Sequence, residues 1–304
     1  MADRAPASPT RAAAAPLKGA PLAAAIRQQV AAALAAHPGV KPCLVNVIAG
    51  DDPASHSYLD AIDRAAGKLG IASRRVALPA AAGERALVDA VAAAGRDPAV
   101  HGILVQFPLP PGVRKEAVAA ALPPAKDVDG LTAASLGAVL AGERRHTAPC
   151  TAAAVAELLA SEPRLSPEGR HVVIVGRSLV VGRPLAAMLA APLPGGQATV
   201  TLCHTRTRDL PRHTTSADIV IVAAGVPALL KPDMVRPGAI VVDVGTHPVT
   251  TPQGPSLVGD VDPAVAGVAG VLTPVPGGVG PVTSAVLMRH VTAAALPGYV
   301  PPAW

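Results

Sequence analysis

Two series of alternating helix and strand patterns follow one another along the chain. In the first series, apolar residues recur every four positions from Leu22 to Leu34, which predicts a helix over residues 21–37. Short apolar runs then predict strands at 43–49, 71–78 and 102–106, with helices between them at 57–69 and 84–96. This repeated strand–helix order is typical of a parallel sheet.

The second series begins after a linking helix predicted at 152–159. Strands are predicted at 171–175, 198–203, 218–223 and 239–243, a helix at 184–189 and a closing helix at 284–295. The composition changes between residues 150 and 165, which places a domain boundary there. We therefore predict an α/β fold of two domains.

The composition agrees with this division and excludes two classes of protein. A chain of 304 residues is long for one core. Half of its residues are apolar but only 1% are aromatic, so Ala, Val and Leu must fill the core, as in buried parallel sheets. No apolar stretch reaches the roughly 18 residues of a membrane span without an interrupting Gly, Pro or charge. Transmembrane and fibrous proteins are thus excluded, and residues 1–15 are predicted to form a disordered tail.

Charge and cysteine content narrow the choice of partner. The net charge is +5, but the basic residues are scattered and few aromatic residues accompany them. This distribution argues against a nucleic acid as the partner and favours an anionic small molecule.

Cys43, Cys150 and Cys203 form no CxxC pattern and no disulfide framework, as expected in a reducing cytoplasm. The histidines show no HxxxH or HExxH pattern, so no metal site is predicted. A nucleophilic Cys150 would need a partnered His; we favour a small buried side chain.

A glycine-containing turn between a predicted strand and helix is the first candidate site. Gly176 and Gly182 would let the backbone approach a phosphate, and the helix N-terminus offers free N–H groups to an anion. Arg177 and Ser178 place a cation and a hydroxyl where a nucleotide phosphate would lie. An arginine here suits a 2′-phosphate, so NADP is favoured over NAD. The alternative is an ordinary strand–helix turn.

Three further features carry candidate chemistry. Residues 273–283 are so rich in Gly and Pro that we expect no regular structure, only a rigid loop that faces a flat ligand or serves as a structural turn. Asp127 and Asp129 could bind a metal, cap a helix or accept hydrogen bonds from a heterocycle. Gln106 ends a predicted strand, the usual place for ligand-binding residues in α/β proteins.

Together these segments resemble the bifunctional methylenetetrahydrofolate dehydrogenase/methenyltetrahydrofolate cyclohydrolase family, in the family's order over residues 17–297. The matching segments are 50–55 with Tyr58, 102–110, 126–130, 149–151, 175–178 with 181, 182 and 184, 203–204, 243–245, 259–261 and 276–281.

The resemblance implies a folate-binding catalytic domain of residues 16–150 plus 284–304, a Rossmann-type NADP domain of residues 151–283, and a cleft between them. It also implies a homodimer through the nucleotide domain, acting on tetrahydrofolate one-carbon derivatives. The implied reactions are oxidation of 5,10-methylenetetrahydrofolate to the methenyl cation and hydrolysis of that cation to 10-formyltetrahydrofolate.

The resemblance also assigns roles to individual residues. Tyr58 would stack on the benzoyl ring of the folate, Asp129 would hydrogen-bond the pterin, and Gln106 would lie beside the reacting carbon. The folate wall would include Pro108, Gly277, Gly278 and Pro281. The nucleotide would be faced by Thr151, Gly176, Arg177, Ser178, Gly182, Val244, Thr246 and Thr283. The catalytic positions would be Tyr58, Ile62, Gln106 and Asp129.

One position departs from the family pattern in a way that changes the expected chemistry. The family reads Tyr-x-x-x-Lys, and its lysine drives the cyclohydrolase step, but Ile62 stands four residues after Tyr58. Arg64 points about 200° away from position 62 on a helix and is a poor substitute. Hydride transfer depends mainly on positioning, whereas hydrolysis needs proton transfer, so we expect a dehydrogenase whose cyclohydrolase activity is weak or absent. Smaller departures are Ala152, Val282 and Thr246–His247.

Two alternatives stay open from the sequence. A diverged paralogue in specialised metabolism would use the same folate cleft for another one-carbon reaction. A non-catalytic folate or nucleotide binder would keep the pocket without the chemistry, although Gln106 and Asp129 argue against it.

Overall fold

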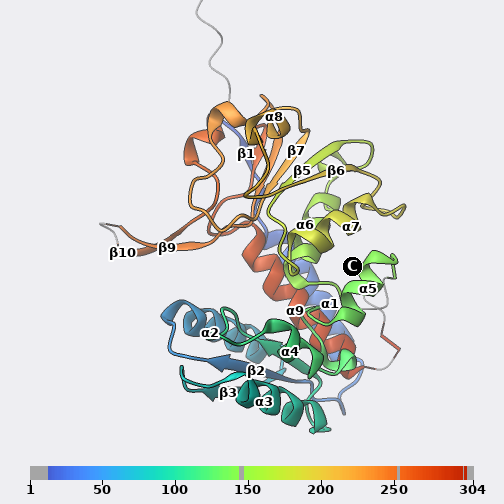
Figure 1. Cartoon of the computed structure of the whole chain (residues 1–304). Helices are drawn as coiled ribbons and strands as arrows, with labels where there is room; N and C mark the ends of the chain where they lie inside the picture. The colour runs from blue at the N-terminus through green and yellow to red at the C-terminus, as the bar shows by residue number, and fades with distance from the viewer. Residues whose placement is uncertain (1–12, 144–146, 252–253, 297, 300–304) are drawn as a thin grey trace, which may run out of the picture.

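The computed structural model describes residues 13–143, 147–251, 254–296 and 298–299, which form two lobes joined by long helices (Figure 1). The small lobe contains a parallel three-stranded sheet in the order β3-β2-β4. Its strands are β2 (Cys43–Ala49), β3 (Ala72–Leu78) and β4 (Gly102–Val105), and its helices are α2 (Pro53–Lys68), α3 (Glu84–Arg96) and α4 (Lys115–Ala120). Helix α5 (Ala133–Leu140) follows in the chain and packs on the large lobe. Short 3₁₀ turns, such as Pro124–Lys126, lie between some of these elements.

The large lobe contains a six-stranded sheet in the order β1-β11-β8-β7-β5-β6, with every pairing parallel. Its strands are β5 (His171–Val175), β6 (Thr199–Cys203), β7 (Ile219–Val222), β8 (Ile240–Asp243), β11 (Val271–Leu272) and β1 (Ala15–Pro16). Its helices are α6 (Cys150–Ala160), α7 (Gly182–Ala190) and α8 (Leu210–Thr214). Alternate residues of β5 enter two different core clusters, so the sheet is buried on both faces.

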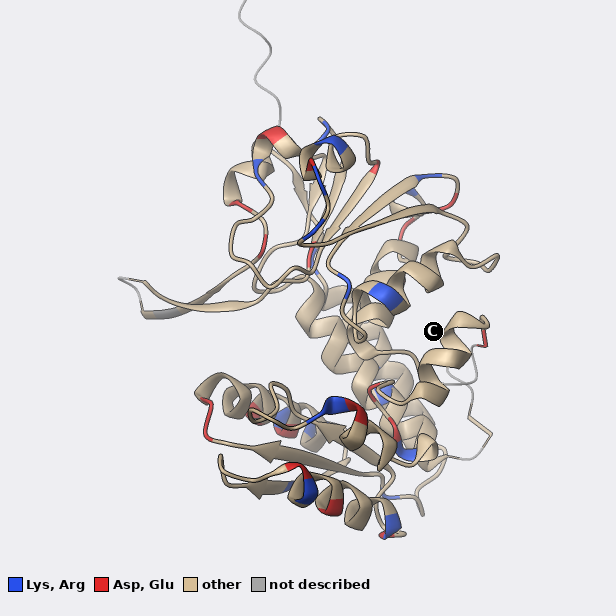
Figure 2. Ribbon diagram, viewed as in Figure 1, with Lys and Arg blue, Asp and Glu red and all other residues tan. Residues whose placement is uncertain are grey.

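Two long helices lie between the lobes. Helix α1 (Ala20–Ala35) packs on α9 (Val279–Ala295), and α9 also packs on α6 of the large lobe and on α2 and β4 of the small lobe. Each helix carries few charged residues, so Figure 2 draws both largely in tan at the centre of the molecule. Because α9 is buried around most of its circumference, it forms a common core with both lobes.

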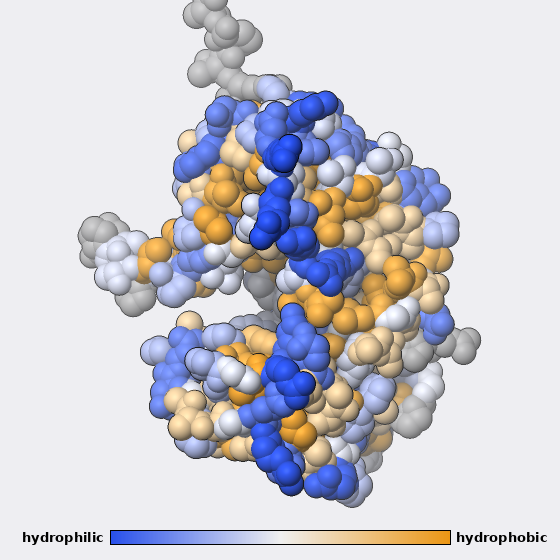
Figure 3. All heavy atoms as spheres, in the orientation of Figure 1, coloured by the Kyte–Doolittle hydropathy of each residue, from blue (hydrophilic) through white to orange (hydrophobic). Residues whose placement is uncertain are grey.

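An antiparallel hairpin of β9 (His247–Thr251) and β10 (Gly254–Val258) projects from the large lobe. In the space-filling view, a notch lies below this hairpin and separates it from the small lobe (Figure 3). Among the described strands, this pair makes no ladder with either parallel sheet.

Several boundaries differ from those predicted from the sequence. The expectation of irregular structure over 273–283 was wrong for its last five residues, because α9 begins at Val279 and not at Ser284. Helix α2 begins at Pro53, four residues early, because the Asp52 carboxylate accepts a hydrogen bond from Ser55 N at 2.9 Å and caps the helix. The hairpin and α8 were not predicted.

Most of the tail predicted at residues 1–15 lies outside the described residues, but its end is structured. Ala14 N donates to Ala266 O and Ala15 N donates to Gly270 O, at 2.7 and 2.9 Å. The described chain therefore begins on the edge of the large sheet before it enters the small lobe.

Candidate active site between the two lobes

Helix α2 contributes two of the predicted site residues, Tyr58 and Ile62, one turn apart. Positions four apart lie on the same side of a helix, so their side chains are neighbours. Tyr58 is 37% exposed, whereas Ile62 is fully buried. Ile62 belongs to the apolar core cluster that also contains Leu59 and Ala66 of the same helix. The position at which the family resemblance predicts a lysine is therefore part of the core.

Gln106 lies directly after β4 and joins the small sheet through its backbone N–H, which donates to Val47 O at 2.8 Å. Its side-chain amide donates to Phe107 O at 2.7 Å and to Ser55 Oγ at 3.4 Å. These bonds tie Gln106 to the first turn of α2. Pro108 lies in the same loop, and the Phe107–Pro108 peptide bond is cis.

Asp127 and Asp129 have different surroundings, which distinguishes the roles left open by the sequence. Asp127 is buried and accepts hydrogen bonds from Leu131 N, Thr132 N and Ser135 Oγ, at 2.9, 2.8 and 2.7 Å. It thus organises the start of α5. Asp129 accepts a bond from Cys150 N at 3.3 Å and remains partly accessible, so it has capacity for a ligand.

The carboxylate of Asp129 lies close to the hydroxyl of Tyr58 and the thiol of Cys150. Burial raises the pKa of Asp129 to about 6, and the bonds from Cys150 oppose this shift. Burial around the hydroxyl, with the charges of Asp129 and Cys150, raises the pKa of Tyr58 above its usual value. The charge of Asp129 is thus felt at the Tyr58 hydroxyl, and the two residues stay predicted members of one site.

His290 of α9 is a site neighbour that the sequence analysis missed. Its Nδ1 lies 3.0 Å from Val128 O and 3.4 Å from Cys150 Sγ, so the histidine that a nucleophilic Cys150 would need is present. Burial and the charge of Asp129, however, raise the pKa of the Cys150 thiol, and Cys150 is only 2% exposed. A protonated, inaccessible thiol is no nucleophile. No local signal could have found His290, since 140 residues separate it from Cys150.

The glycine-containing turn after β5 is closely packed. Gly176 has φ +128°, and a Cβ there would lie 2.1 Å from Ala223 O. A Cβ on Gly182 would lie 1.9 Å from Gly176 O. Both positions therefore require glycine, and the turn brings its backbone against the start of α7. This close approach fits the phosphate cradle predicted for a dinucleotide.

Two exposed polar residues in this turn face solvent. Arg177 and Ser178 are both exposed, and Ser178 Oγ accepts a bond from Val181 N at 3.1 Å. Gly176 N donates to Cys203 O at 2.9 Å, which joins the turn to the end of β6. The arginine is accordingly available to an anion bound at the carboxyl edge of the large sheet.

Two buried carboxylates hold the neighbouring loops, and the sequence analysis missed them. Asp243 accepts bonds from Gly245 N and Asp260 N at 3.0 and 2.9 Å, and burial raises its pKa to about 6. Asp260 accepts bonds from Ala224 N and Gly225 N at 2.7 and 2.9 Å. They shape the loop that carries the predicted nucleotide residues Val244 and Thr246.

Asp260 has a second partner in that loop. His247 Nε2 lies 2.7 Å from Asp260 Oδ1, so one of the residues that depart from the family pattern contacts a buried carboxylate.

The other predicted residues lie at helix starts beside these loops. Gly277 has φ +107° and its carbonyl accepts a bond from Gly19 N at 2.9 Å, which fixes the chain before α9. Gly278 caps α9, while Pro281 and Thr283 lie in its first turns. Thr151 is the second residue of α6.

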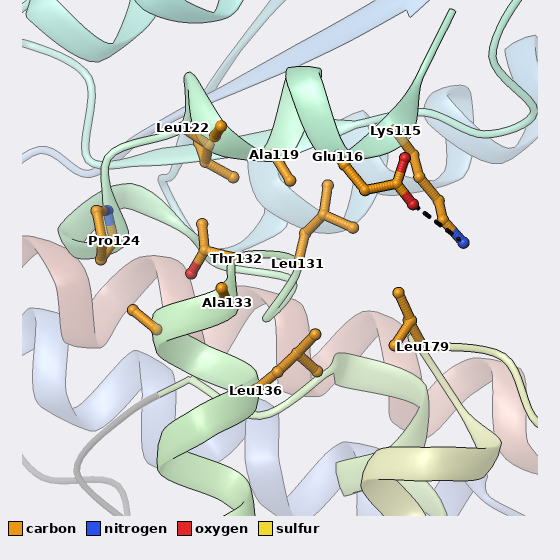
Figure 4. A pocket seen from close by; sticks show the side chains of 12 residues that line it. Lys115, Glu116, Ala119, Leu122, Pro124, Leu131, Thr132, Ala133, Leu136 and Leu179 are labelled. Atoms are coloured by element: carbon orange, nitrogen blue, oxygen red, sulfur yellow. Dashed lines mark ion pairs between the residues drawn. The ribbon is translucent and has the colours of Figure 1, made fainter.

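A separate apolar cavity of about 360 Å³ lies between α4 and α5 (Figure 4). Leu122 and Leu136 line it, and Leu179 reaches it from the turn after β5. None of the predicted folate residues lines this cavity.

Among the described residues, no group of His, Cys, Asp and Glu could hold a metal ion. Likewise, no described helix is both long and apolar enough to cross a membrane.

Fold and site together define a two-lobed α/β protein with a dinucleotide-type turn at the carboxyl edge of its larger sheet. Comparison with family models makes this specific. Residues 17–129 match the catalytic domain of tetrahydrofolate dehydrogenase/cyclohydrolase, and residues 149–297 match its NAD(P)-binding domain. The chain therefore belongs to the tetrahydrofolate dehydrogenase/cyclohydrolase family, which confirms both the resemblance and the predicted two-domain α/β fold.

Individual relatives agree over almost the whole length. The chain is 47% identical to Bifunctional protein FolD 2 of Frankia casuarinae, covering 92% of this chain and 95% of the relative. The bifunctional enzyme FolD from Campylobacter jejuni has a similar structure, with a TM-score of 0.85 and 38% sequence identity. The match covers 93% of this chain and 99% of that chain. The structure of the Trypanosoma brucei methylenetetrahydrofolate dehydrogenase-cyclohydrolase, complexed with NADP cofactor and inhibitor, is also similar, with a TM-score of 0.85 and 37% sequence identity. The match covers 92% of this chain and 97% of that chain.

Proposed function

We propose that this protein oxidises 5,10-methylenetetrahydrofolate to 5,10-methenyltetrahydrofolate with NADP. The methylene carbon loses a hydride, which passes to the oxidised nicotinamide, and the products are the methenyl cation and NADPH. Tyr58, Gln106 and Asp129 would bind and orient the folate from the small lobe. No side chain has to give or take a proton in this step, so positioning is the main contribution of the protein.

The close-packed turn of Gly176 and Gly182 is the observation that carries the proposal. Its glycines let the backbone after β5 pack directly against the start of α7, where a helix N-terminus can bind a phosphate, and Arg177 is exposed beside it. A guanidinium suits the 2′-phosphate that distinguishes NADP from NAD. The oxidised nucleotide would supply the hydride acceptor.

We further propose that hydrolysis of the methenyl cation is weak or absent. Water must attack the methenyl carbon, and protons must move as the ring opens. Ile62 can neither donate nor accept a proton, and it is fully buried in the core. The curated relatives carry bifunctional names, so this chain would differ from them in its second activity.

A spectrophotometric assay tests these proposals directly. The purified protein receives methylenetetrahydrofolate with NADP and, separately, with NAD, and formation of the methenyl product and the reduced nucleotide is followed. We expect turnover with NADP, a preference for NADP over NAD, and accumulation of the methenyl product. Absence of turnover with both nucleotides would contradict the dehydrogenase proposal.

We also infer a homodimer through the nucleotide domain, in a reducing cytoplasm. A two-stranded hairpin is marginally stable alone, so the projecting β9–β10 pair suits a contact with a second copy. Leu257 on this hairpin is 38% exposed. Light scattering should give the mass of a dimer for the wild type and a lower average mass for Leu257→Glu, in which a charge weakens the contact.

The proposed compartment rests on the cysteines. Cys43, Cys150 and Cys203 form no disulfide among the described residues, as a reducing cytoplasm favours.

A further inference from the structure

The carbonyl oxygen of Val128 is held from two helices at once. Cys150 Sγ at the start of α6 lies 3.2 Å from it, and His290 Nδ1 on α9 lies 3.0 Å from it. Val128 is 1% exposed, Cys150 2% and His290 5%, so no bulk water competes for these bonds. Helices from distant parts of the chain therefore meet at one backbone atom.

The protons in this cluster can be assigned from its chemistry. A carbonyl oxygen only accepts hydrogen bonds, so the 3.0 Å contact requires a proton on His290 Nδ1. That nitrogen then cannot accept from the thiol, whose sulfur lies 3.2 Å from Val128 O and also faces the Asp129 carboxylate. The raised pKa of the thiol agrees with a retained proton. The donor that the Val128 carbonyl does not share is therefore His290 Nδ1.

The same contacts determine where the Asp129 carboxylate lies. Asp129 follows Val128, and its Oδ1 accepts a bond from Cys150 N at 3.3 Å. On its other side, Gly130 has φ +65°, and a Cβ there would lie 2.5 Å from Pro149 N. The backbone of 128–130 is thus pressed against 148–150, and the Asp129 side chain has little freedom to turn.

We infer that His290 is a positioning residue for the folate site, which acts through the Val128 carbonyl to hold the Asp129 carboxylate toward the pterin. This rests on the proposed function, since Asp129 is the residue proposed to bind the folate. Helix α9 is well suited to the task because the neighbouring Arg289 forms a buried ion pair with Glu157 of α6, with Nη1 2.9 Å from Oε2. The histidine therefore projects from a helix that cannot shift easily.

A pair of conservative variants separates this role from simple packing. In His290→Asn, the side-chain amide can place a donor near the position of Nδ1. In His290→Gln, the donor lies one carbon further out and misses the Val128 carbonyl. We expect His290→Gln to raise the KM for methylenetetrahydrofolate roughly three- to tenfold, the value of one net hydrogen bond. The KM for NADP should change less than about twofold, and His290→Asn should stay near the wild type.

Thr292→Val provides the matched control. Thr292 is also fully buried on α9, and its Oγ1 donates to Met288 O at 2.8 Å, within the helix. This variant loses a buried hydrogen bond on the same helix without touching Val128, so it should lower the melting temperature and leave the folate KM unchanged.

The outcomes are distinct. A wild type without turnover overturns the proposed function and this inference with it. An active wild type with an unchanged KM in His290→Gln overturns the positioning role alone. An equal rise of the folate KM in Thr292→Val also overturns it, because the effect would then follow helix stability.

Discussion

The small-lobe wall and the large-lobe wall of the site differ in what they offer a ligand. On the small-lobe wall, the inner face of α2 is apolar at Leu59 and Ile62, and Tyr58 lies at its edge. On the large-lobe wall, Arg177 and Ser178 are exposed on a turn of backbone N–H groups. The first wall thus offers an apolar surface with one aromatic ring, and the second offers an exposed cation and a hydroxyl.

This difference shows how one family fold can separate two reactions. Hydride transfer requires that two rings be held against each other, and in our proposal both walls keep the residues for this. Hydrolysis requires a group that exchanges protons at the reacting carbon, and position 62 has none. The first reaction depends on shape, while the second depends on one titratable side chain.

The largest effect is expected at Ile62. The wild type should hydrolyse methenyltetrahydrofolate about 10²- to 10⁴-fold more slowly than an enzyme with a proton-transfer group there. Ile62→Lys should raise hydrolysis above the spontaneous rate, provided that nearby polar groups solvate the amine, because an unsolvated buried charge costs several kcal/mol. The loss of methenyl absorbance measures this, with Ile62→Met as an uncharged control. A wild type that hydrolyses the methenyl product as fast as it forms would contradict our interpretation.

The next effect concerns the large-lobe wall. Arg177→Ala should raise the KM for NADP tenfold or more and change that for NAD much less, because a hydrogen bond to a charged group contributes about 1.5–3 kcal/mol. Initial rates with each nucleotide give both values. Arg183→Ala alters another exposed arginine in the same segment and serves as the control. Equal losses with both nucleotides would remove Arg177 from the 2′-phosphate.

Asp129 makes the small-lobe wall sensitive to pH. Its pKa of about 6 means that the carboxylate is mostly protonated at pH 5 and mostly ionised at pH 7. If the ionised form binds the pterin, the folate KM should be about tenfold higher at pH 5 than at pH 7. Asp129→Asn should make this KM nearly independent of pH. A profile unchanged by that substitution would assign the dependence to another group.

The same pKa has an opposite effect on folding. A carboxyl group whose pKa is raised in the folded state stabilises the fold most below its unfolded pKa of about 4, and this contribution is lost as the pH rises through about 6. Asp243 shares this direction on the large-lobe side. Comparison of urea unfolding at pH 4.5 and pH 7 in wild type and Asp129→Asn isolates the part due to Asp129.

The smallest effect is expected at Ser178. Its Oγ accepts the bond from Val181 N that closes the turn before α7. Ser178→Ala should raise the KM for NADP only a few-fold, in line with one net hydrogen bond of about 1 kcal/mol. Ser178→Thr keeps the acceptor and should restore the value. A loss as large as that of Arg177→Ala would mean that Ser178 contacts the phosphate directly.

The sequence predicted the strands and long helices well because their apolar patterns are local. The runs at 43–49 and 171–175 coincide with β2 and β5. The start of α9 was misplaced because Gly and Pro ordinarily interrupt helices, while here they occupy its first turn, where a missing N–H costs little. The β9–β10 hairpin has little apolar alternation, so its strands gave no signal.

Candidate site residues that stand in short sequence motifs could be predicted, whereas contacts between residues far apart in the sequence could not. Tyr58 and Asp129 could be named from motifs, and the charge of Asp129 raises the pKa of Tyr58. The sequence could not tell that Asp127 holds the loop before α5 while Asp129 stays partly accessible, because both are carboxylates in one short segment. His290 could not be found at all, because its contact with Val128 exists only after the last helix has packed.

The packing of α1 on α9 has a consequence for synthesis on the ribosome. The buried positions Ala23, Ile26 and Val30 of α1 are made early, but the helix that covers them ends at Ala295. Until that segment leaves the exit tunnel, the nascent chain carries an uncovered apolar stripe, and the Val128 carbonyl lacks the His290 donor. We therefore expect a message cut short before the codons of α9 to yield a product in which α1 and the segment around Asp129 stay unfinished.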